Sequence, residues 1–340
     1  MVTLKDVAQK AGVSEATVSL VLNERPGVSP KTRAKVLALA HELGYSPNAV
    51  ARSLAMNKTS TIGLVVTDIE NPFYGSLVHF LSEHAQKQNY SLLIAASGDE
   101  IENEDSIINV FLSRQVDGII IVPSQNVRTN YQIFKMLKKR DIPFVFAVSY
   151  YPEYGDAFVM TDYRAGSYKL TKYLLSLGHK KIVHLTGPNS EAPLNKERIR
   201  GYHEALDECG LADKSEIISC SKADFFSGYQ EVKQLLSVEK PDAIISINDI
   251  MILGARKAIS EAGYKVPKDI SIAGYDDVSF ASIIETPLTT VKQNIEEIAR
   301  LSIDLVIKKI EDHTIVRSRL LVAPELILRD TTAPHSDQGA

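Results

Sequence analysis

Thr3-Leu-Lys-Asp-Val-Ala-Gln-Lys-Ala-Gly-Val-Ser14 is the stretch that decides the fold of the N-terminal part of the chain. Thr3 and Asp6 have the spacing of a capping box, in which two side chains bind the free amide groups at the start of a helix. Gly12 suits the left-handed residue that ends such a helix, and Ser14 is well placed to cap the next one. Two short helices joined by a tight turn that contains glycine are typical of a helix-turn-helix.

A third predicted helix braces the first two. The second helix runs to about Asn23, and Arg25-Pro26-Gly27 then breaks the chain. Ser29 is the predicted cap of the third helix, Pro30 is its first residue, and Gly44 ends it. The apolar side chains that should form the core of this unit are Leu4, Val7, Ala8, Ala11, Val18, Val21, Leu22, Val36, Leu39, Ala40 and Leu43.

The side of the second helix that faces away from this core is mostly small or polar, which suits the major groove of DNA. The amide groups around Ser14 can hold a phosphate. From the pattern alone, a plain three-helix unit with solvated polar faces is the alternative. The predicted DNA-facing residues are Glu15, Ala16, Ser19 and Asn23, with further phosphate contacts from Thr17, Lys31, Thr32 and Arg33.

The chain has 340 residues, which predicts two or three domains. Residues 1–58 hold eight basic and four acidic residues, whereas the other 282 hold 30 and 38, so only the N-terminal part suits a polyanion. No apolar run approaches the roughly 20 residues of a membrane span, and Lys5 and Asp6 stand where a signal peptide needs an apolar core. Cys209 and Cys220 form no CxxC motif, which fits a reducing cytoplasm.

From Thr61 onward, short apolar runs alternate with helical stretches, which predicts an α/β fold with parallel sheets. Residues 117–124 and 242–249 look like corresponding strands of two similar halves. Two such sheets side by side form a cleft at the carboxyl ends of their strands, the usual ligand site. The predicted strands span 62–66, 92–96, 118–122, 144–148, 158–160, 182–185, 243–247 and 270–273, and the predicted helices span 73–89, 102–114, 130–140, 164–177, 196–209, 227–238 and 250–262.

The N-terminal stretch closely resembles the DNA-binding head of the lactose-repressor/galactose-repressor (LacI/GalR) family. The similar stretches are 3–14, 16–19, 21–23, 28–29, 32–36, 43–45 and 47–54. The resemblance implies base contacts from Glu15, Ala16 and Leu20, and it adds Thr3 and Ser29 to the predicted DNA-binding residues. Leu20 departs from the polar residue often found at its position, so it can touch a thymine methyl group but cannot hydrogen-bond a guanine.

The segment that follows the head, Asn48-Ala-Val-Ala-Arg-Ser-Leu54, is too short to be a stable helix alone. In the family this segment folds on DNA beside its twin in a dimer, and the residue matching Leu54 wedges into a base step of the minor groove. The resemblance therefore implies DNA contacts from Asn48, Ala51, Arg52 and Leu54. Taken alone, Leu54 fits a linker residue that packs on the body.

Residues 60–330 resemble the effector domain of the same family, which is similar to periplasmic sugar-binding proteins. The matching stretches are 68–74, 178–182, 198–202, 248–251, 274–277 and 287–291. The resemblance implies that Arg198, Asn248 and Asp276 hydrogen-bond the effector, and that Phe73 and Tyr74 can stack on its ring. The remaining predicted effector-binding residues are Asp68, Ser124, Phe226 and Asp249, and Asp249 is also expected to cap the helix after it.

These assignments have plainer alternatives. Arg198 and Asp276 could pair with each other, Asn248 could be a turn residue that ends its strand, and Phe73 could belong to the core. The placement of these residues at strand ends favours the functional interpretation.

Two departures from the family pattern concern the wall of the predicted pocket. Ala223 stands where the family often has an aromatic residue that stacks on the effector. Val148 and Ser149 end the fourth strand where several members have an aspartate, and Tyr150 and Tyr151 follow. The sequence therefore predicts a more aromatic wall that suits a larger or less polar ligand, such as a disaccharide.

The predicted domains are a helix-turn-helix head at 1–46, a hinge helix and linker at 47–59, an effector-binding and dimerisation domain at 60–332, and a flexible tail at 333–340. Within the effector domain, the N-subdomain takes about 60–160 plus 292–322, and the C-subdomain takes about 161–291 plus 323–332. The tail has no heptad pattern, so we predict a dimer rather than a coiled-coil tetramer.

Together these features predict a cytoplasmic transcription regulator of the repressor type, which binds a palindromic operator as a homodimer under the control of a sugar-like effector. We predict no cofactor, no metal, no catalytic residue and no membrane partner. A sugar-active enzyme is one alternative, but GxSxG, Walker A, GxGxxG and HExxH motifs are absent. An exported sugar-binding protein is the other, and the attached head argues against it.

Overall fold

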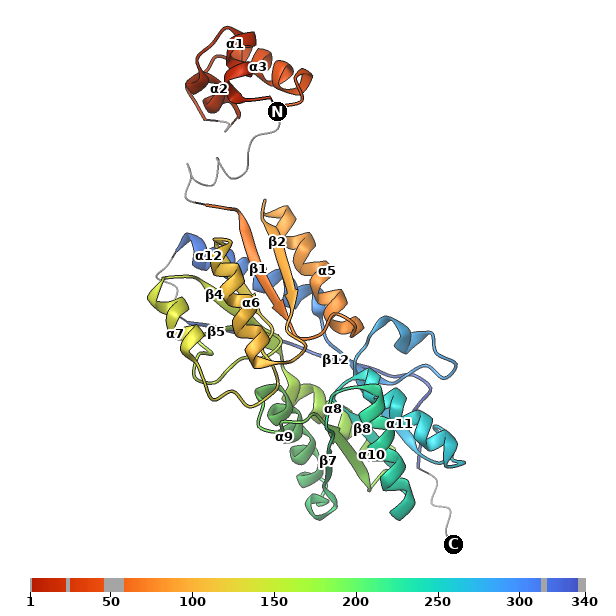
Figure 1. Ribbon diagram of the computed structural model, residues 1–340. Helices are drawn as coiled ribbons and strands as arrows, with labels where there is room; N and C mark the ends of the chain where they lie inside the picture. Colours follow the sequence, from red (N-terminus) through yellow and green to blue (C-terminus); the bar gives the residue numbers. More distant parts are fainter. Residues whose placement is uncertain (1, 23–24, 46–57, 313–316, 336–340) are drawn as a thin grey trace. The chain divides into compact units, whose positions relative to one another are not determined.

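The computed structural model describes residues 2–22, 25–45, 58–312 and 317–335 (Figure 1). The chain divides into two compact units, Met1–Ser60 and Thr61–Ala340. No helix among the described residues is long and apolar enough to cross a membrane.

The first unit is built from three helices, α1 (Leu4–Ala11), α2 (Glu15–Leu22) and α3 (Pro30–Glu42). The predicted capping box is confirmed, because Thr3 and Asp6 bind each other's backbone amide groups. The Ser14 and Ser29 hydroxyls accept the amide hydrogens of the third helical residue at 3.1 and 3.2 Å. Val7, Val18 and Val36 are fully buried at the centre of the unit. The local caps and the core pattern therefore produce the predicted helix-turn-helix.

The second unit begins with a six-stranded parallel sheet in the order β11-β5-β4-β3-β1-β2. Apolar side chains fill both faces of its inner strands, as a parallel sheet covered by helices requires. Its strands are β1 (Thr61–Val66), β2 (Ser91–Ala96), β3 (Gly118–Ile121), β4 (Phe144–Ala147), β5 (Ala157–Thr161) and β11 (Ser318–Val322), with helices α5 (Pro72–Lys87), α6 (Ile101–Ser113), α7 (Gln132–Lys139) and α12 (Ile295–Glu311).

A second six-stranded sheet has the order β12-β10-β9-β8-β6-β7, and only β12 is antiparallel to its neighbour. Its strands are β6 (Ile182–Thr186), β7 (Glu216–Ser219), β8 (Ala243–Ser246), β9 (Ser271–Asp276), β10 (Thr290–Lys292) and β12 (Glu325–Ile327), with helices α8 (Tyr163–Ser176), α9 (Pro193–Asp207), α10 (Phe225–Val238) and α11 (Asp249–Glu261). The predicted pair of parallel α/β subdomains is confirmed. We call the part around the first sheet the N-subdomain and the part around the second the C-subdomain.

The chain passes between the two sheets three times, from β5 to α8, from β10 to α12 and from β11 to β12. The sequence pattern missed β7, β11, β12 and α12. These strands are three to five residues long, and β7, β11 and β12 are only partly buried, so they lack a clear apolar run.

Residues 333–335 are hydrogen-bonded to the C-subdomain. The amide of Ala333 donates to the Ser271 hydroxyl at 3.2 Å, and the amide of His335 donates to the Leu177 carbonyl at 2.8 Å. The prediction of a flexible tail from residue 333 is therefore wrong for 333–335, because these residues bind the backbone of the C-subdomain.

Candidate functional site

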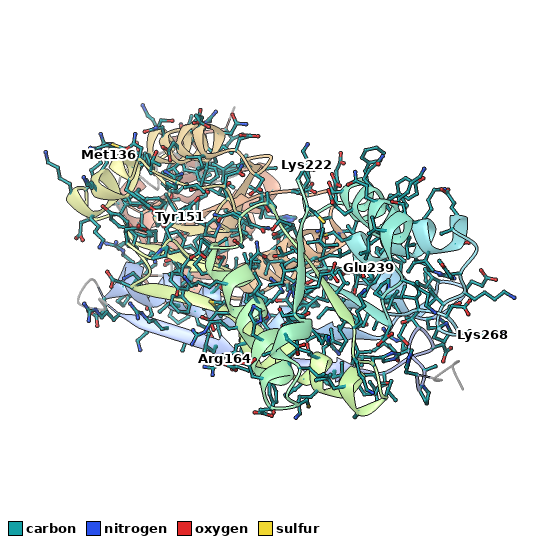
Figure 2. The ribbon with its side chains drawn as sticks, turned by 90° about the horizontal axis from the view of Figure 1, so that it is seen from below. Met136, Tyr151, Arg164, Lys222, Glu239 and Lys268 are labelled. Carbon is teal, nitrogen blue, oxygen red and sulfur yellow. The ribbon has the colours of Figure 1, made fainter. Side chains whose placement is uncertain are left out.

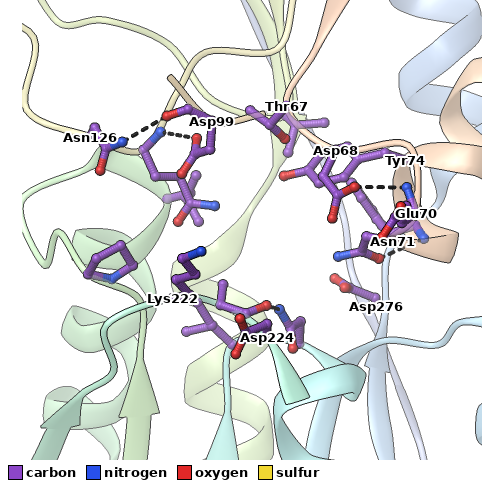
Figure 3. A pocket seen from close by; sticks show the side chains of 18 of the residues that line it. Thr67, Asp68, Glu70, Asn71, Tyr74, Asp99, Asn126, Lys222, Asp224 and Asp276 are labelled. Atoms are coloured by element: carbon purple, nitrogen blue, oxygen red, sulfur yellow. Dashed lines mark hydrogen bonds between the residues drawn. The ribbon is translucent and has the colours of Figure 1, made fainter. Parts of the chain in front are cut away.

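A cleft of about 570 Å³ lies where the carboxyl ends of the two sheets face each other (Figure 3). Loops that follow β1, β2, β3 and β4 line it from the N-subdomain, and loops that follow β6, β7, β8 and β9 line it from the C-subdomain. Strand ends are the usual ligand site of parallel α/β sheets. Six of the predicted effector-binding residues line the cleft, namely Asp68, Phe73, Tyr74, Arg198, Asn248 and Asp276.

Arg198 on α9 is the buried cation of this cleft, with 3% of its surface exposed. Its guanidinium carbon lies 4.0 Å from the ring centre of Tyr163 and 4.4 Å from that of Tyr275. Its Nη1 donates to the Leu194 carbonyl at 3.5 Å, whereas its Nε has no hydrogen-bond partner among the described residues. No carboxylate of the described residues lies within ion-pair distance, so the alternative that Arg198 pairs with Asp276 is wrong. The guanidinium keeps donor capacity for a ligand.

Asp276 ends β9 in a backbone conformation with φ 114°, which side-chain-bearing residues rarely adopt. Its Oδ1 accepts a hydrogen bond of 2.6 Å from Nε2 of Gln293, whose Oε1 accepts one of 2.5 Å from the Thr161 hydroxyl. Thr161 and Gln293 stand at two of the passages between the sheets. The carboxylate is thus held in place from both subdomains and turned toward the cleft (Figure 3).

Burial raises the pKa of Asp276 to about 7, although Arg198 lowers it. A carboxyl group whose pKa rises on folding contributes stability that is fully present below its unfolded pKa of about 3.9 and is lost as the pH rises through about 7.

We therefore expect Asp276→Asn to raise the free energy of unfolding at pH 8 by on the order of 1–2 kcal/mol, and the gain to vanish near pH 4. Urea unfolding at both pH values measures it, with exposed Asp207→Asn as the control. A gain that is equal at both pH values would contradict this assignment.

Phe73 and Tyr74 begin α5 beneath the cap Asn71, and their rings meet edge to face at 5.1 Å. Phe73 is buried in the core and also lines the cleft, so its place in the core is confirmed and its stacking on an effector stays a prediction. Burial raises the pKa of Tyr74 to about 12, so its hydroxyl stays protonated. The pair presents an aromatic surface to the cleft.

Asn248 caps α11. Its Oδ1 accepts the amide hydrogen of Met251 at 2.7 Å, and its Nδ2 donates to the Ala223 carbonyl at 2.9 Å. The expectation that Asp249 caps this helix is wrong. Asp249 is instead fully buried and accepts from the Thr290 hydroxyl at 2.6 Å and from the Val278 amide at 2.9 Å.

Three predicted effector-binding residues, Ser124, Phe226 and Asp249, are absent from the cleft lining. Ser124 turns inward, where its amide donates to Glu104 at 3.0 Å and its hydroxyl to the Asp99 carbonyl at 2.6 Å. Phe226 points outward from the first turn of α10 and is 64% exposed. Asp249 is held by the bonds just described. A residue can follow a strand and still face away from the ligand site.

The prediction of a more aromatic wall after β4 is also wrong. Val148 lines the cleft, whereas Tyr150 stacks on Phe158 at 4.3 Å and Tyr151 donates to the buried Glu104 carboxylate. Figure 2 shows Tyr151 among the side chains of the N-subdomain. These two tyrosines therefore support no argument for a disaccharide.

The cleft also contains polar residues that the sequence analysis missed. Several follow predicted strands, and this position is the signal that could have identified them. Lys222 and Asp224 follow β7, which was not predicted. The missed polar residues are Thr67, Glu70, Asn71, Asp99, Glu100, Gln125, Asn126, Tyr163, Ser221, Lys222, Asp224 and Gln293.

In the head, Glu15 and Ala16 are exposed at the start of α2, and Thr17, Ser19 and Leu20 are partly exposed. Arg33 donates to the Val21 and Arg25 carbonyls at 3.2 and 2.5 Å, so its guanidinium holds the end of α2. Among the other predicted DNA-binding residues, Asn23, Asn48, Ala51, Arg52 and Leu54 lie outside the described part of the chain.

Each of the two units matches a family of known proteins. Residues 3–48 match the bacterial regulatory proteins of the lacI family, and residues 59–328 match the periplasmic binding proteins and sugar-binding domain of the LacI family. The chain belongs to the LacI family. It is a DNA-binding transcription regulator in which a helix-turn-helix unit is joined to an effector-binding domain.

Three relatives illustrate the similarity. The ribose operon repressor of Escherichia coli (strain K12) is 34% identical over 97% of this chain and 99% of its own length. A crystal structure of the lac repressor dimer bound to operator and the anti-inducer ONPF superposes with a TM-score of 0.86 at 30% identity, covering 98% of this chain and 99% of that one. A LacI-family regulator from Enterococcus faecium with bound ribose has a TM-score of 0.72 at 29% identity, covering 81% of this chain and 100% of that one.

Proposed function

We propose that this regulator represses transcription by binding a palindromic operator as a homodimer, and that a neutral sugar in the cleft controls this binding. The observation that carries the sugar assignment is Arg198, a buried guanidinium with an unpartnered Nε, set in a cleft that also holds the Asp276 carboxylate and the Phe73–Tyr74 surface. Guanidinium and carboxylate groups match vicinal hydroxyls, and aromatic faces match the C–H face of a sugar ring.

The charge of the cleft supports a neutral ligand. Six carboxylates line it, whereas Arg198 and Lys222 are its cations among the described residues. A phosphate or carboxylate on the ligand would be repelled by this excess of negative charge. The ribose bound to the Enterococcus faecium relative is consistent with this proposal.

The proposed DNA interface is the exposed N-terminal end of α2 around Glu15 and Ala16, together with segment 48–54. One short recognition helix provides little affinity, so two heads must act together, as in the operator-bound lac repressor dimer. The same proposal puts the protein in the cytoplasm.

We propose that the protein binds its effector without converting it. The Asp249 carboxylate, next to the cleft residue Asn248, is enclosed by its own hydrogen bonds and does not serve as an acid or base for a ligand. The described residues contain no group of three or more His, Cys, Asp or Glu side chains that could hold a metal ion.

Thermal unfolding with D-ribose, other monosaccharides, disaccharides and sugar phosphates tests the sugar assignment. A sugar at 100 times its Kd should stabilise the protein by about 2.7 kcal/mol, which raises the melting temperature by a few degrees. A response to sugar phosphates but not to neutral sugars would overturn the assignment. Operator selection from random DNA, with a protein lacking residues 1–58 as the negative control, tests the DNA-binding role.

A further inference from the structure

We propose that Gln125 is a positioning residue that fastens the two subdomains across the mouth of the cleft. Gln125 belongs to the loop after β3 in the N-subdomain. Its backbone carbonyl accepts a hydrogen bond of 2.9 Å from Nδ2 of Asn189, and its side-chain Oε1 accepts one of 3.3 Å from Nδ2 of Asn195. Asn189 and Asn195 both belong to the C-subdomain, so one residue of the N-subdomain holds two residues of the other.

The loop that carries Gln125 is fixed within the N-subdomain. The amide of Gln125 donates to Oδ1 of Asp99 at 2.8 Å, and the amide of Ser124 donates to the Glu104 carboxylate at 3.0 Å. Glu104 itself is fully buried and paired with Arg128 at 2.8 Å. A loop with these supports presents its carbonyl and side chain in one orientation, so the bonds to Asn189 and Asn195 require no reordering of the N-subdomain.

On the C-subdomain side, Gly187 leaves the space that the hydrogen bond between Gln125 and Asn195 needs. A methyl group on Gly187, directly after β6, would lie 3.0 Å from Nδ2 of Asn195, and 3.2 Å from both Oε1 of Gln125 and Cδ1 of Ile247. A Cβ at this position therefore crowds the atoms of the Gln125–Asn195 hydrogen bond, and they must shift by a few tenths of an ångström. The backbone of Gly187 lies outside the left-handed region, so alanine itself is tolerated by the main chain.

The two hydrogen bonds of Gln125 lie beside the cleft, and their partners in the C-subdomain do not line it. Gln125 lines the cleft, whereas Asn189 and Asn195 do not. Breaking the bond from Asn189 therefore changes the balance between closed and open cleft without altering a cleft-lining residue. Each lost hydrogen bond should shift that balance about fivefold toward the open form. A role of this closed–open equilibrium in regulation rests on the proposed function, but the equilibrium shift itself does not.

Small-angle X-ray scattering of the full chain without any ligand tests the proposal. Asn189→Asp removes the donor to Gln125 and keeps Oδ1, which accepts from the Glu191 amide at 3.1 Å. Gly187→Ala acts on the second bond by steric contact. We expect a larger radius of gyration in each variant and the largest in the double variant. Asn103→Asp is the matched control, because Nδ2 of Asn103 donates to the Ser97 carbonyl at 3.1 Å within the N-subdomain.

Equal radii in the wild type, both single variants and the double variant would overturn the proposal. An increase in the control as large as that in Asn189→Asp would also overturn it, because the effect would then come from the added charge. Thermal unfolding verifies that each variant is folded. If Asn189→Asp does not fold, Gly187→Ala still tests the proposal. Because no sugar is used, failure of the sugar assignment leaves this result unaffected.

Discussion

Arg198→Met is expected to weaken effector binding by about 100-fold or more while leaving the protein folded. Hydrogen bonds to a charged group contribute about 1.5–3 kcal/mol each, and the buried guanidinium can offer two or more to a sugar. Methionine has a similar length and can pack against the rings of Tyr163 and Tyr275. Arg198 forms no direct ion pair among the described residues, although its charge lowers the pKa of the buried Asp276, so the pKa of that carboxyl group is expected to rise in the variant.

Isothermal titration calorimetry with the sugar that gives the largest thermal shift measures this loss. Arg200→Met is the matched control, because Arg200 lies two residues further along α9 and forms an exposed ion pair of 2.8 Å with Glu197. We expect a change below about threefold in the control, since exposed ion pairs contribute little. If both variants bound the sugar equally well, Arg198 would not be the residue that recognises it.

Arg128→Met is expected to lower the free energy of unfolding by about 3–5 kcal/mol, because it leaves a buried carboxylate without its partner. Arg128 and Glu104 are joined at 2.8 Å, and both side chains are fully buried. Arg128 also donates to Asp105 at 2.8 Å and lies 4.9 Å from the ring centre of Tyr151. Glu104 additionally accepts from Tyr151 and from the Ser124 amide.

The pH dependence of the stability lost in Arg128→Met shows whether the loss comes from the unpaired Glu104 carboxylate or from the missing packing of the arginine side chain. Burial raises the pKa of Glu104, and the Arg128 charge opposes that rise. Without Arg128 the folded-state pKa is higher still, so the stability deficit is largest at neutral pH and shrinks as the pH falls toward the unfolded pKa of about 4.3. Urea unfolding at pH 7 and pH 4.5 measures both values.

The double variant Glu104→Gln/Arg128→Met should recover most of the lost stability at pH 7, because it buries no charge and keeps acceptors for Ser124 and Tyr151. Arg164→Met, which breaks an exposed ion pair with Glu204, is the control and should change stability by less than about 1 kcal/mol. A double variant as unstable as Arg128→Met would show that packing of the arginine, rather than its charge, sustains this region.

The helix-turn-helix was predictable because the interactions that define it are local. Thr3 with Asp6, Ser14 with Thr17, and Ser29 with Thr32 each lie three residues apart, and their hydrogen bonds form as predicted. The alternation of apolar and helical stretches likewise predicted two parallel sheets and a cleft at their carboxyl ends. Both signals depend on short-range order, which a sequence displays directly.

Side-chain direction at the strand ends was decided by tertiary structure. Ser124, Phe226 and Asp249 follow predicted strands or begin predicted helices, yet they turn away from the cleft, whereas Asp99 and Gln293 line it. The direction depends on loop backbone angles, such as φ 114° at Asp276, and on partners far along the chain. Asp249, for example, is held by Thr290, 41 residues away.

The sequence by itself therefore determined the helix-turn-helix unit, the two-sheet body and the edge of the sheets at which the cleft lies. Only the tertiary structure decided that Arg198 lies over the rings of two tyrosines, that Glu104 and Arg128 form a buried pair, and that Gln125 joins the subdomains. The physical reason is that burial, desolvation and hydrogen bonding of these groups arise between segments brought together only when the sheets pack.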